Sequence, residues 1–280
     1  LITNQIVGEG KIERLVNLAS WTDVKVLVDD EENVEMIDRA ASEVGVKVGI
    51  LVEVDVGMNR CGVEPGDEAL ALSRTVEKKE NLEFRGLEGY EGHAVLVKDY
   101  QTRKRKTERA LALLRETKKL LEKNEMKVPI VTGGATGTYM ITGDDTVATE
   151  VEAGSYVTMD ARYSNVERVD FENALTVLTT VISRPNRRTA IVDAGLKAMT
   201  NDFGPPVPVS SVKMGLDDHL SEEHGKLLLE EESSDPVLGD LVEFIPSHGC
   251  TTINLHEKYH VVRDGRVSAV WNIEGRGKVT

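Results

Sequence analysis

One short segment of the chain carries two side chains whose types and spacing are suited to binding a metal ion. Residues 247–250 read Ser-His-Gly-Cys, so the imidazole of His248 and the thiol of Cys250 stand two positions apart. On an extended segment both would point to one face, and a His/Cys pair suits Zn²⁺ better than Mg²⁺ or Ca²⁺. Two protein ligands leave positions for water and substrate, which favours a catalytic site; a buried cysteine beside an incidental histidine is the alternative.

A glycine-rich segment, residues 132–138, has the composition of a phosphate-binding turn. It reads Thr-Gly-Gly-Ala-Thr-Gly-Thr and lies between an apolar run and a short helical stretch. Backbone N–H groups in such a turn, with a helix N-terminus, can hold a phosphate. Residues 153–156 follow the next apolar run, as expected for the phosphate site after the last two strands of a βα barrel. Without a Walker lysine or Rossmann spacing, nucleotide binding is disfavoured; glycines that only make tight turns are the alternative.

Two other apolar runs end in polar side chains. The segment 54–62 contains Arg60, and the segment 89–93 contains Tyr90 and His93. A fixed guanidinium suits a carboxylate or a phenolate oxygen. Because parallel strands in a barrel end at one rim, we expect these side chains to gather there; a structural salt bridge is the alternative role for Arg60.

The elements that must position these side chains alternate regularly through the first 160 or so residues. Short runs rich in β-branched residues alternate with amphipathic stretches, which predicts βα units around a parallel sheet. The basic stretch 98–127 has leucines at helical spacing and is interpreted as an outer helix rather than an anion site. The predicted strands are 1–7, 24–28, 46–54, 82–90, 128–132 and 147–151, and the predicted helices are 10–19, 31–44, 66–80, 100–125 and 136–141.

From about Val166 the pattern changes to period-two strands and turns, which predicts a second, mostly β domain. We therefore place the domain boundary between residues 165 and 166. The segment 202–211, with three prolines, is interpreted as a rigid loop. The predicted strands here are 175–183, 188–193, 241–245, 258–263 and 266–272, the last two joined by a hairpin turn.

Only six βα units are predicted, whereas a closed barrel of this class needs eight. The first residue, Leu1, already lies inside a predicted strand. We therefore expect a preceding segment on the order of 80 to 100 residues to be absent from this sequence. An open six-unit α/β sheet is the alternative.

Charge and composition exclude several classes of protein. The 280 residues contain 34 Lys and Arg against 48 Asp and Glu, a formal charge of −14. Such a charge disfavours nucleic-acid and anionic-membrane binding. The sequence has no membrane-length apolar run and no signal-peptide pattern at its start. Its two cysteines make no disulfide framework, so a cytoplasmic location is expected.

Taken together, these segments resemble the fold-type III pyridoxal phosphate (PLP) enzymes of the D-threonine aldolase and D-serine dehydratase family, relatives of alanine racemase. The resemblance implies a (β/α)8 TIM-type barrel, truncated here to about six units, followed by a mostly β domain. The segments that carry it occur in family order: 54–62, 86–93, 132–138, 152–160, 193–197, 221–225 and 246–256.

The resemblance also implies roles for individual residues. Arg60 and Tyr90 would face the PLP ring, and His248 and Cys250 would bind a divalent metal. The family's Schiff-base lysine lies upstream of anything that aligns here, so the 280 residues alone are expected to bind PLP weakly and to be inactive; Lys197 does not replace it. A homodimer is implied, because one subunit's β domain closes over another's barrel. The PLP phosphate would be held by Gly133, Gly134, Thr136, Gly154, Ser155 and Tyr156.

The implied activity is that of a lyase acting on D-3-hydroxy amino acids, and two cleavages fit. Loss of the α proton and the β-hydroxide is the D-serine dehydratase reaction, and Cα–Cβ cleavage is the D-threonine aldolase reaction. Cys250 favours zinc over manganese and, by resemblance, the dehydratase reaction; aldol cleavage is the alternative. Racemisation is disfavoured because it needs no metal at the β position. A non-catalytic PLP-binding protein is disfavoured because the chain keeps a metal site.

Overall fold

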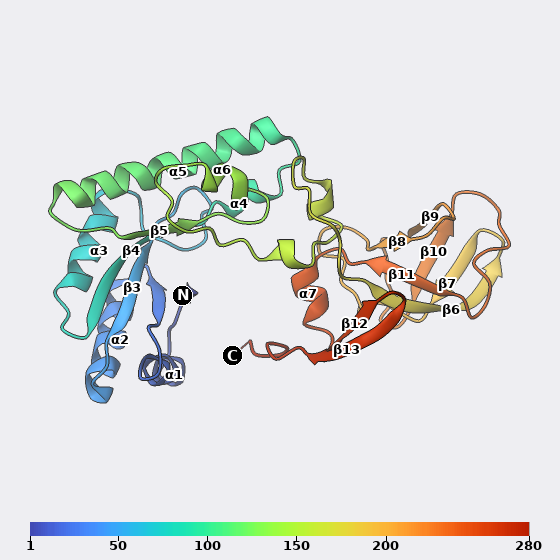
Figure 1. Ribbon diagram of the computed structural model, residues 1–280, viewed down its shortest axis with the longest axis horizontal. Helices are drawn as coiled ribbons and strands as arrows, with labels where there is room; N and C mark the ends of the chain where they lie inside the picture. Colours follow the sequence, from blue (N-terminus) through green and yellow to red (C-terminus); the bar gives the residue numbers. More distant parts are fainter. Residues whose placement is uncertain (280) are drawn as a thin grey trace. The chain divides into compact units, whose positions relative to one another are not determined.

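A computed structural model describes residues 1–279, and its first unit, residues 1–154, is built on a parallel sheet (Figure 1). The strand order β1-β2-β3-β4-β5 follows the sequence, and every neighbouring pair is parallel. The strands are β1 (Ile2–Gln5), β2 (Lys25–Val28), β3 (Val48–Glu53), β4 (Leu82–Gly89) and β5 (Ile130–Gly133). The helices are α1 (Glu9–Ala19), α2 (Glu31–Val44), α3 (Asp67–Glu77), α4 (Gly92–Val95), α5 (Tyr100–Lys123) and α6 (Tyr139–Gly143).

Local signals explain where the main helices begin and end. Asp30 caps α2 by accepting hydrogen bonds from the amides of Glu32 (2.7 Å) and Asn33 (3.3 Å), and Gly45 ends it with a φ of 74°. Asp99 caps α5 in the same way through Thr102 N (2.8 Å). The predicted helix 31–44 is confirmed at both ends. The basic stretch after residue 98 is confirmed as a helix, with Leu111, Leu114 and Leu121 in the core.

The two faces of the parallel sheet differ in polarity. Val52, Leu87 and Val131 belong to the hydrophobic core that the sheet forms with its helices. Because successive side chains of a strand alternate between faces, Glu53, Glu88 and Thr132 lie on the opposite face. All three of these polar residues are buried. The sheet therefore carries buried polar groups on one face near its carboxyl ends.

The predicted sixth strand, 147–151, is wrong: the segment is not a strand in the structure. It does run beside β5, because the amides of Thr149 and Glu152 donate to the carbonyls of Val131 (2.8 Å) and Gly133 (2.9 Å). The Thr149 hydroxyl, however, accepts a hydrogen bond from the Val131 amide (3.0 Å). The Val131 N–H is thus bound by a side chain, whereas in a β-ladder it would donate to a backbone carbonyl of the neighbouring strand.

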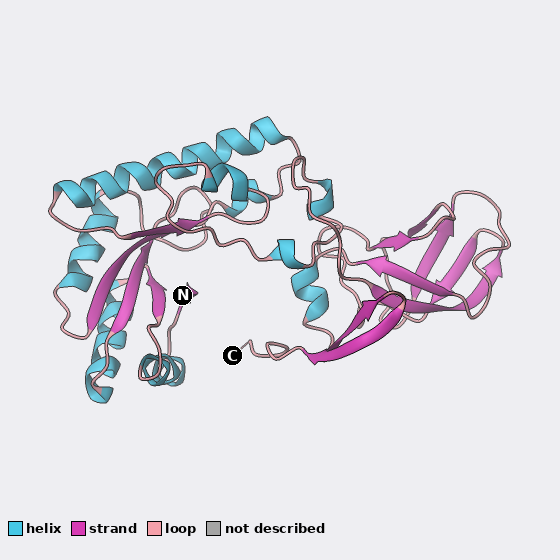
Figure 2. Cartoon of the chain, in the orientation of Figure 1, coloured by secondary structure: helices cyan, strands magenta, loops and turns pink. Residues whose placement is uncertain are grey.

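The second unit begins at Ser155 and is mostly β (Figure 2). Six strands form an antiparallel sheet in the order β8-β11-β6-β7-β10-β9, and β12 and β13 form a separate hairpin. The strands are β6 (Val177–Asn186), β7 (Thr189–Val192), β8 (Val207–Val209), β9 (Met214–Leu216), β10 (Gly225–Leu229), β11 (Leu241–Ile245), β12 (Lys258–Arg263) and β13 (Arg266–Asn272). The short helices are η1 (Ser155–Val157), η2 (Tyr163–Asn165) and α7 (Gly249–Ile253).

Three strands of this unit were not predicted. β8 lies inside the segment interpreted as a loop, and it contains Pro208. β8 is an edge strand that pairs with β11 alone. An edge strand can contain proline because the missing N–H can face away from the neighbouring strand, where no backbone hydrogen bond is lost. The other two, β9 and β10, pair with each other, and β10 also pairs with β7.

The first unit ends at Gly154, before the boundary predicted after residue 165. The intervening residues are tied to the second unit, for example by the amide of Ala161, which donates to Pro246 O (3.0 Å). Within residues 1–279, no helix is long and apolar enough to cross a membrane.

Candidate functional site

In the first unit, the loop after β3 presents Arg60 to the end of β4. Asp55 orders this loop by accepting hydrogen bonds from the amides of Gly57 (2.8 Å), Met58 (2.9 Å) and Asn59 (3.1 Å). The Arg60 guanidinium carbon lies 5.2 Å from the centroid of the Tyr90 ring. The structure thus brings together the cation and the aromatic ring that the sequence placed at successive strand ends.

The turn after β5 is held by Glu91, a residue that the sequence analysis missed. The Glu91 carboxylate is 1% exposed and accepts hydrogen bonds from Thr138 Oγ1 (2.6 Å) and the Gly134 amide (3.0 Å). The Gly134 N–H, predicted to bind phosphate, therefore already has an acceptor. The only signal in the sequence was an acidic residue directly after Tyr90, and nothing in the sequence showed which backbone it would reach.

Two glycines of this turn are required by packing. A Cβ on Gly133 would lie 2.4 Å from the carbonyl oxygen of Gly89, and one on Gly137 would lie 1.8 Å from that of Val95. Both distances are too short for any side chain. These glycines let the turn lie against the end of β4 and against α4, and the turn continues to Thr138, so α6 starts later than predicted.

The chain passes this turn again after residue 149. Glu152 N donates to Gly133 O (2.9 Å), and a Cβ on Gly154, an exposed glycine, would meet no atom within 4 Å. Thr136 is buried in the turn. The remaining two predicted phosphate ligands, Ser155 and Tyr156, belong to the second unit, in η1, where the Tyr156 ring packs 5.4 Å from that of Phe171.

Three carboxyl groups lie close together on the polar face of the sheet. Burial, reinforced by the negative charges of Glu152 and Glu53, raises the pKa of Glu88 to about 9. Glu88 Oε2 is buried without a hydrogen-bond partner among residues 1–279. Glu53 accepts a hydrogen bond from Gln5, and Glu152 accepts one from Thr132 Oγ1 (2.9 Å). Such perturbed carboxyl groups are frequent at functional sites, and this cluster was also missed from the sequence.

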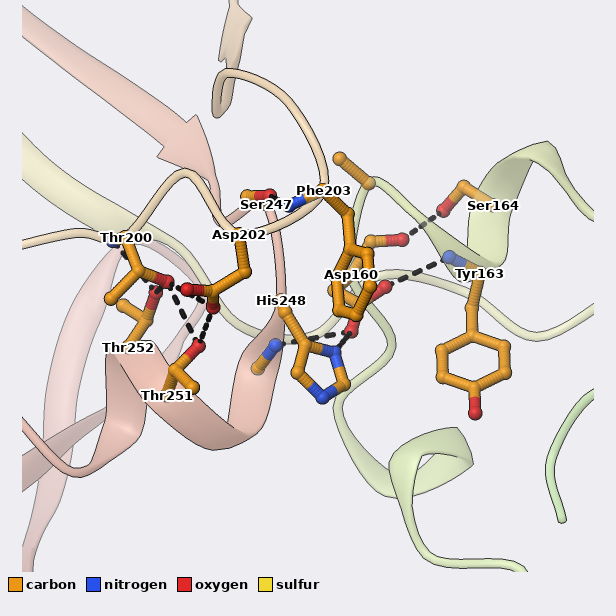
Figure 3. Close-up of polar contacts among 12 residues, drawn as sticks. Asp160, Tyr163, Ser164, Thr200, Asp202, Phe203, Ser247, His248, Thr251 and Thr252 are labelled. Carbon is orange, nitrogen blue, oxygen red and sulfur yellow. Dashed lines mark hydrogen bonds and ion pairs between the residues drawn. The ribbon is translucent and has the colours of Figure 1, made fainter. Parts of the chain in front are cut away.

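In the second unit, His248 is held by a buried carboxylate, Asp160 (Figure 3). The distance from His248 Nδ1 to Asp160 Oδ2 is 2.7 Å. Asp160 is 0% exposed and also accepts hydrogen bonds from the amides of Gly249 (3.0 Å) and Tyr163 (2.8 Å). Burial alone would raise the pKa of Asp160, but these hydrogen bonds, led by that of His248, hold it below its usual range. The ionised Asp160 carboxylate therefore accepts a hydrogen bond from a protonated His248 Nδ1.

The predicted extended segment through His248 and Cys250 is wrong after the histidine. His248 has extended backbone angles but caps α7, and Cys250 lies in the first turn of that short helix. The imidazole nevertheless acts on the thiol, because its influence holds the pKa of Cys250 below its usual value. The hydrogen bond with Asp160, and after it the influence of Cys250, raise the pKa of His248 to about 10.

This donor set fits a divalent metal. A carboxylate that fixes Nδ1 leaves Nε2 for a metal ion, the usual arrangement behind a histidine ligand, and the thiol beside it already favours its thiolate form. No cluster of three or more His, Cys, Asp and Glu placed to hold a metal occurs in residues 1–279. A metal here would have two protein ligands and would complete its coordination with water or substrate.

Of three further residues, only His93 lies against one of these groups of contacts, since a Cβ on Gly57, in the loop that carries Arg60, would lie 3.4 Å from its Cε1. Lys197 forms ion pairs with Glu223 (2.6 Å) and Glu222 (3.8 Å) at the surface, as expected for a lysine without a catalytic role. His93 lies in α4, and its Nδ1 is buried without a partner within the described chain. His224 is exposed.

Comparisons with known proteins agree with this two-part architecture. The family model "Alanine racemase, N-terminal domain" matches residues 1–162, and "Putative serine dehydratase domain" matches residues 174–262. The D-threonine aldolase of Arthrobacter sp. is 36% identical over 99% of this chain and 73% of its own length. The 3-hydroxy-D-aspartate aldolase of Paracoccus denitrificans (strain Pd 1222) is 34% identical over the same shares.

Solved structures match over nearly the whole chain. The D-threonine aldolase from Filomicrobium marinum superposes with a TM-score of 0.96 at 34% identity, covering 100% of this chain and 78% of that one. D-threo-3-hydroxyaspartate dehydratase from Delftia sp. HT23 gives a TM-score of 0.84 at 25% identity, covering 95% and 76%. The predicted alanine racemase-like barrel with a C-terminal β domain is confirmed. The chain belongs to the fold-type III, alanine racemase-like family of PLP-type lyases that includes the D-threonine and 3-hydroxy-D-aspartate aldolases.

Proposed function

We propose that this chain forms the greater part of a PLP- and divalent-metal-dependent lyase that cleaves the Cα–Cβ bond of D-3-hydroxy amino acids to glycine and an aldehyde. The observation that carries the proposal is the Asp160–His248–Cys250 arrangement, which supplies an oriented imidazole and a thiolate-favouring thiol. The two aldolase relatives, similar over 99% of the chain, support aldol cleavage.

When bound, PLP supplies an electron sink at the substrate's α carbon, and a divalent metal supplies Lewis-acid activation of the β-hydroxyl. Asp160 would hold the proton on His248 Nδ1 and so direct Nε2 to a metal, which would displace the proton that a pKa of about 10 leaves on that atom. Cys250 provides the second ligand atom, Sγ. Because Asp160 also binds the amide of Gly249, the ligand segment is fixed at its start rather than free to turn.

The residues proposed to hold PLP lie at the end of the parallel sheet. Arg60 and Tyr90 form one wall, with the guanidinium over the phenol ring. We propose that the phosphate lies next to the turn of residues 133–138, near Gly154, where an added Cβ would meet no atom within 4 Å. Glu91 keeps this turn in place but engages the Gly134 amide, so Gly133, Gly134 and Thr136 act through the shape of the turn, and we assign the polar contacts to Ser155 and Tyr156.

Elimination is the second candidate, and Cys250 favours it. A His/Cys pair suits zinc better than manganese, and a zinc-dependent dehydratase reaction is the one that the sequence favoured. A dehydratase of 3-hydroxyaspartate is among the structures that share this fold at 25% identity. In this reaction the α proton and the β-hydroxide leave, and the product is a 2-oxo acid with ammonia.

The two reactions are separated by their products. The full-length protein, treated with EDTA, is reloaded with PLP and with zinc or manganese, and is supplied with D-threonine or D-serine. We expect glycine and acetaldehyde from D-threonine; pyruvate and ammonia from D-serine would instead support elimination. Neither product with either metal would overturn the lyase proposal and favour a PLP-binding protein without turnover.

The two cysteines of the chain provide a matched control for the metal. Cys250→Ala should abolish the metal-restored activity, whereas Cys61→Ala removes the same thiol from the loop of the first unit and should leave the response to metal unchanged. Equal metal responses in the two variants would remove Cys250 from the metal site.

A further inference from the structure

The segment of residues 200–203, between β7 and β8, forms hydrogen bonds with the residues that flank the two proposed metal ligands (Figure 3). The Phe203 amide donates to Ser247 Oγ (3.1 Å), and Ser247 directly precedes the first ligand. The Thr200 amide donates to Thr252 Oγ1 (3.3 Å), two residues after the second ligand. Ser247 and Thr252 are both buried. The segment 200–203 therefore binds the ligand segment on both sides.

Asp202 is the charged residue of this segment, and its carboxylate meets the residue that follows Cys250. Asp202 Oδ2 accepts hydrogen bonds from the hydroxyl groups of Thr251 and of Thr200 (3.0 Å for Thr200). The two hydroxyl oxygens lie 2.8 Å apart, and Figure 3 shows both beside the carboxylate. Hydrogen bonds to a charged acceptor are about twice as strong as those between neutral groups. Asp202 is therefore the strongest acceptor that the segment offers to the ligand segment.

Phe203 extends the same segment to the other ligand. Its ring meets the His248 ring edge-on, with 5.3 Å between the two centroids. Because Asp202 and Phe203 are neighbours in the chain, one short segment contacts both the imidazole and the residue after Cys250. A shift of this segment would change the separation of the two ligands.

The helix that carries Cys250 is too short to fix its own conformation. α7 has five residues, and isolated helices shorter than about 12 to 15 residues are marginal in water. The backbone bonds from Thr252 N to His248 O (3.4 Å) and from Asn254 N to Cys250 O (3.3 Å) are long for N–H···O bonds. Contacts from outside the helix are therefore needed to fix the direction of the Cys250 side chain.

We propose that Asp202 is a positioning residue for Cys250: by binding the Thr251 hydroxyl, it fixes the first turn of α7 and so the place of Sγ relative to the His248 imidazole. This inference rests on the proposed metal site. Asp160 binds Nδ1 of His248, and Asp202 binds the residue after Cys250, so each ligand is supported by its own carboxylate. Carboxylates behind metal ligands orient the ligands and raise metal affinity.

The test removes each partner of the Asp202–Thr251 bond in the full-length protein. Asp202→Asn removes the charge, and Thr251→Val removes the hydroxyl group while keeping the branched shape. We expect each substitution to weaken zinc binding, measured by calorimetry, about tenfold. In the cobalt-loaded protein each should also weaken the thiolate-to-cobalt absorption band, which reports on Cys250 directly. Thr251→Ser keeps a hydroxyl group and should retain the zinc affinity and the band.

Thr176→Val is the matched control, because it removes a hydrogen bond of the same type in the same unit, from the Thr176 hydroxyl to the Glu243 carboxylate (2.8 Å). It should leave zinc binding and the cobalt spectrum unchanged. The double variant Asp202→Asn/Thr251→Val should weaken zinc binding no more than either single variant, because both remove one interaction.

Three outcomes would overturn the inference. The first is a zinc affinity and a cobalt spectrum equal to those of the wild type in Asp202→Asn or in Thr251→Val. The second is losses that add in the double variant, and the third is an equal loss in Thr176→Val. If Asp202→Asn does not fold by circular dichroism, Thr251→Val and Thr251→Ser decide in its place.

The zinc measurement also keeps this inference separate from the lyase proposal. A wild type that binds zinc but cleaves neither D-threonine nor D-serine would overturn the lyase proposal, and the zinc affinities of the variants would still decide the role of Asp202. An active wild type whose zinc affinity is unaffected by Asp202→Asn would overturn the role of Asp202 alone. A wild type that binds no zinc would overturn both.

Discussion

Each of the two units of this chain buries a carboxyl group, and the two groups behave in opposite ways. Glu88, on the polar face of the parallel sheet, has its pKa raised to about 9 by burial and by Glu152 and Glu53. Asp160, in the second unit, is buried as deeply, yet its pKa is lowered. The difference is the number of donors: Asp160 accepts three hydrogen bonds, and Glu88 Oε2 accepts none from the described residues.

This contrast separates two kinds of buried acid. Burial alone favours the neutral form of a carboxyl group, whereas burial with converging N–H donors keeps it ionised. The ionised Asp160 is therefore suited to orient an imidazole, and the neutral Glu88 is suited to donate a hydrogen bond. Five substitutions at and around these groups follow in order of expected effect.

Removing Asp160 should have the largest effect. Asp160→Ala leaves His248 Nδ1 and two amides without their acceptor, which we expect to lower the free energy of unfolding by about 3 to 5 kcal/mol. Zinc affinity should also fall about 10- to 100-fold. Urea denaturation measures the stability, and calorimetry measures the zinc affinity. Asp217→Ala is the control, because it removes a carboxylate of the same unit that pairs with Lys226 nearer the surface. Unchanged zinc affinity in Asp160→Ala would contradict the orienting role.

The glycines beside the first site should divide into two classes. Gly137→Ala places a methyl group against Val95 O and should destabilise the protein by about 2 to 3 kcal/mol. The methyl group added by Gly154→Ala would meet no atom, so the melting temperature should stay within about 2 °C of the wild type. PLP binding, measured by absorbance, should be weaker. PLP binding by Gly154→Ala equal to that of the wild type would remove this residue from the phosphate site.

Glu88 should make stability depend on pH. The folded protein keeps the Glu88 proton up to about pH 9, whereas the unfolded chain loses it near the ordinary glutamate pKa of 4.5. The folded state thus binds more protons between these values, so the free energy of unfolding falls as pH rises through them. Glu88→Gln should equal the wild type near pH 5 and exceed its stability by about 1 to 3 kcal/mol at pH 8.

Urea denaturation at pH 5, 6.5 and 8 measures this difference. Glu83→Gln, at a partly exposed glutamate of the same strand, is the control. Parallel pH profiles of the wild type and Glu88→Gln would show that Glu88 is ionised in the folded protein.

Arg60→Ala should have the smallest effect on stability. Arg60 is exposed, and its contact with the Tyr90 ring is worth about 0.5 to 1 kcal/mol. The substitution should weaken PLP binding several-fold while shifting the melting temperature by a few degrees at most, as measured by PLP titration and thermal unfolding. A large loss of stability in proportion to the loss of PLP binding would make Arg60 a structural residue.

The sequence determined the elements whose signals are local. The helix 31–44 lies between an aspartate cap and a glycine, and the strands 241–245, 258–263 and 266–272 are confirmed with the predicted bounds. The meeting of Arg60 and Tyr90 was also predictable, because both follow neighbouring parallel strands that end at one rim.

Tertiary structure alone decided which polar groups became partners. Asp160 and His248 are 88 residues apart, Glu91 reaches the Gly134 amide across 43 residues, and the Thr149 hydroxyl replaces the bond that would have made a sixth strand. The physical reason is that a hydrogen bond between distant residues depends on where the packed elements place its donor and acceptor. A periodic pattern in the sequence records only which face of its own element each side chain occupies.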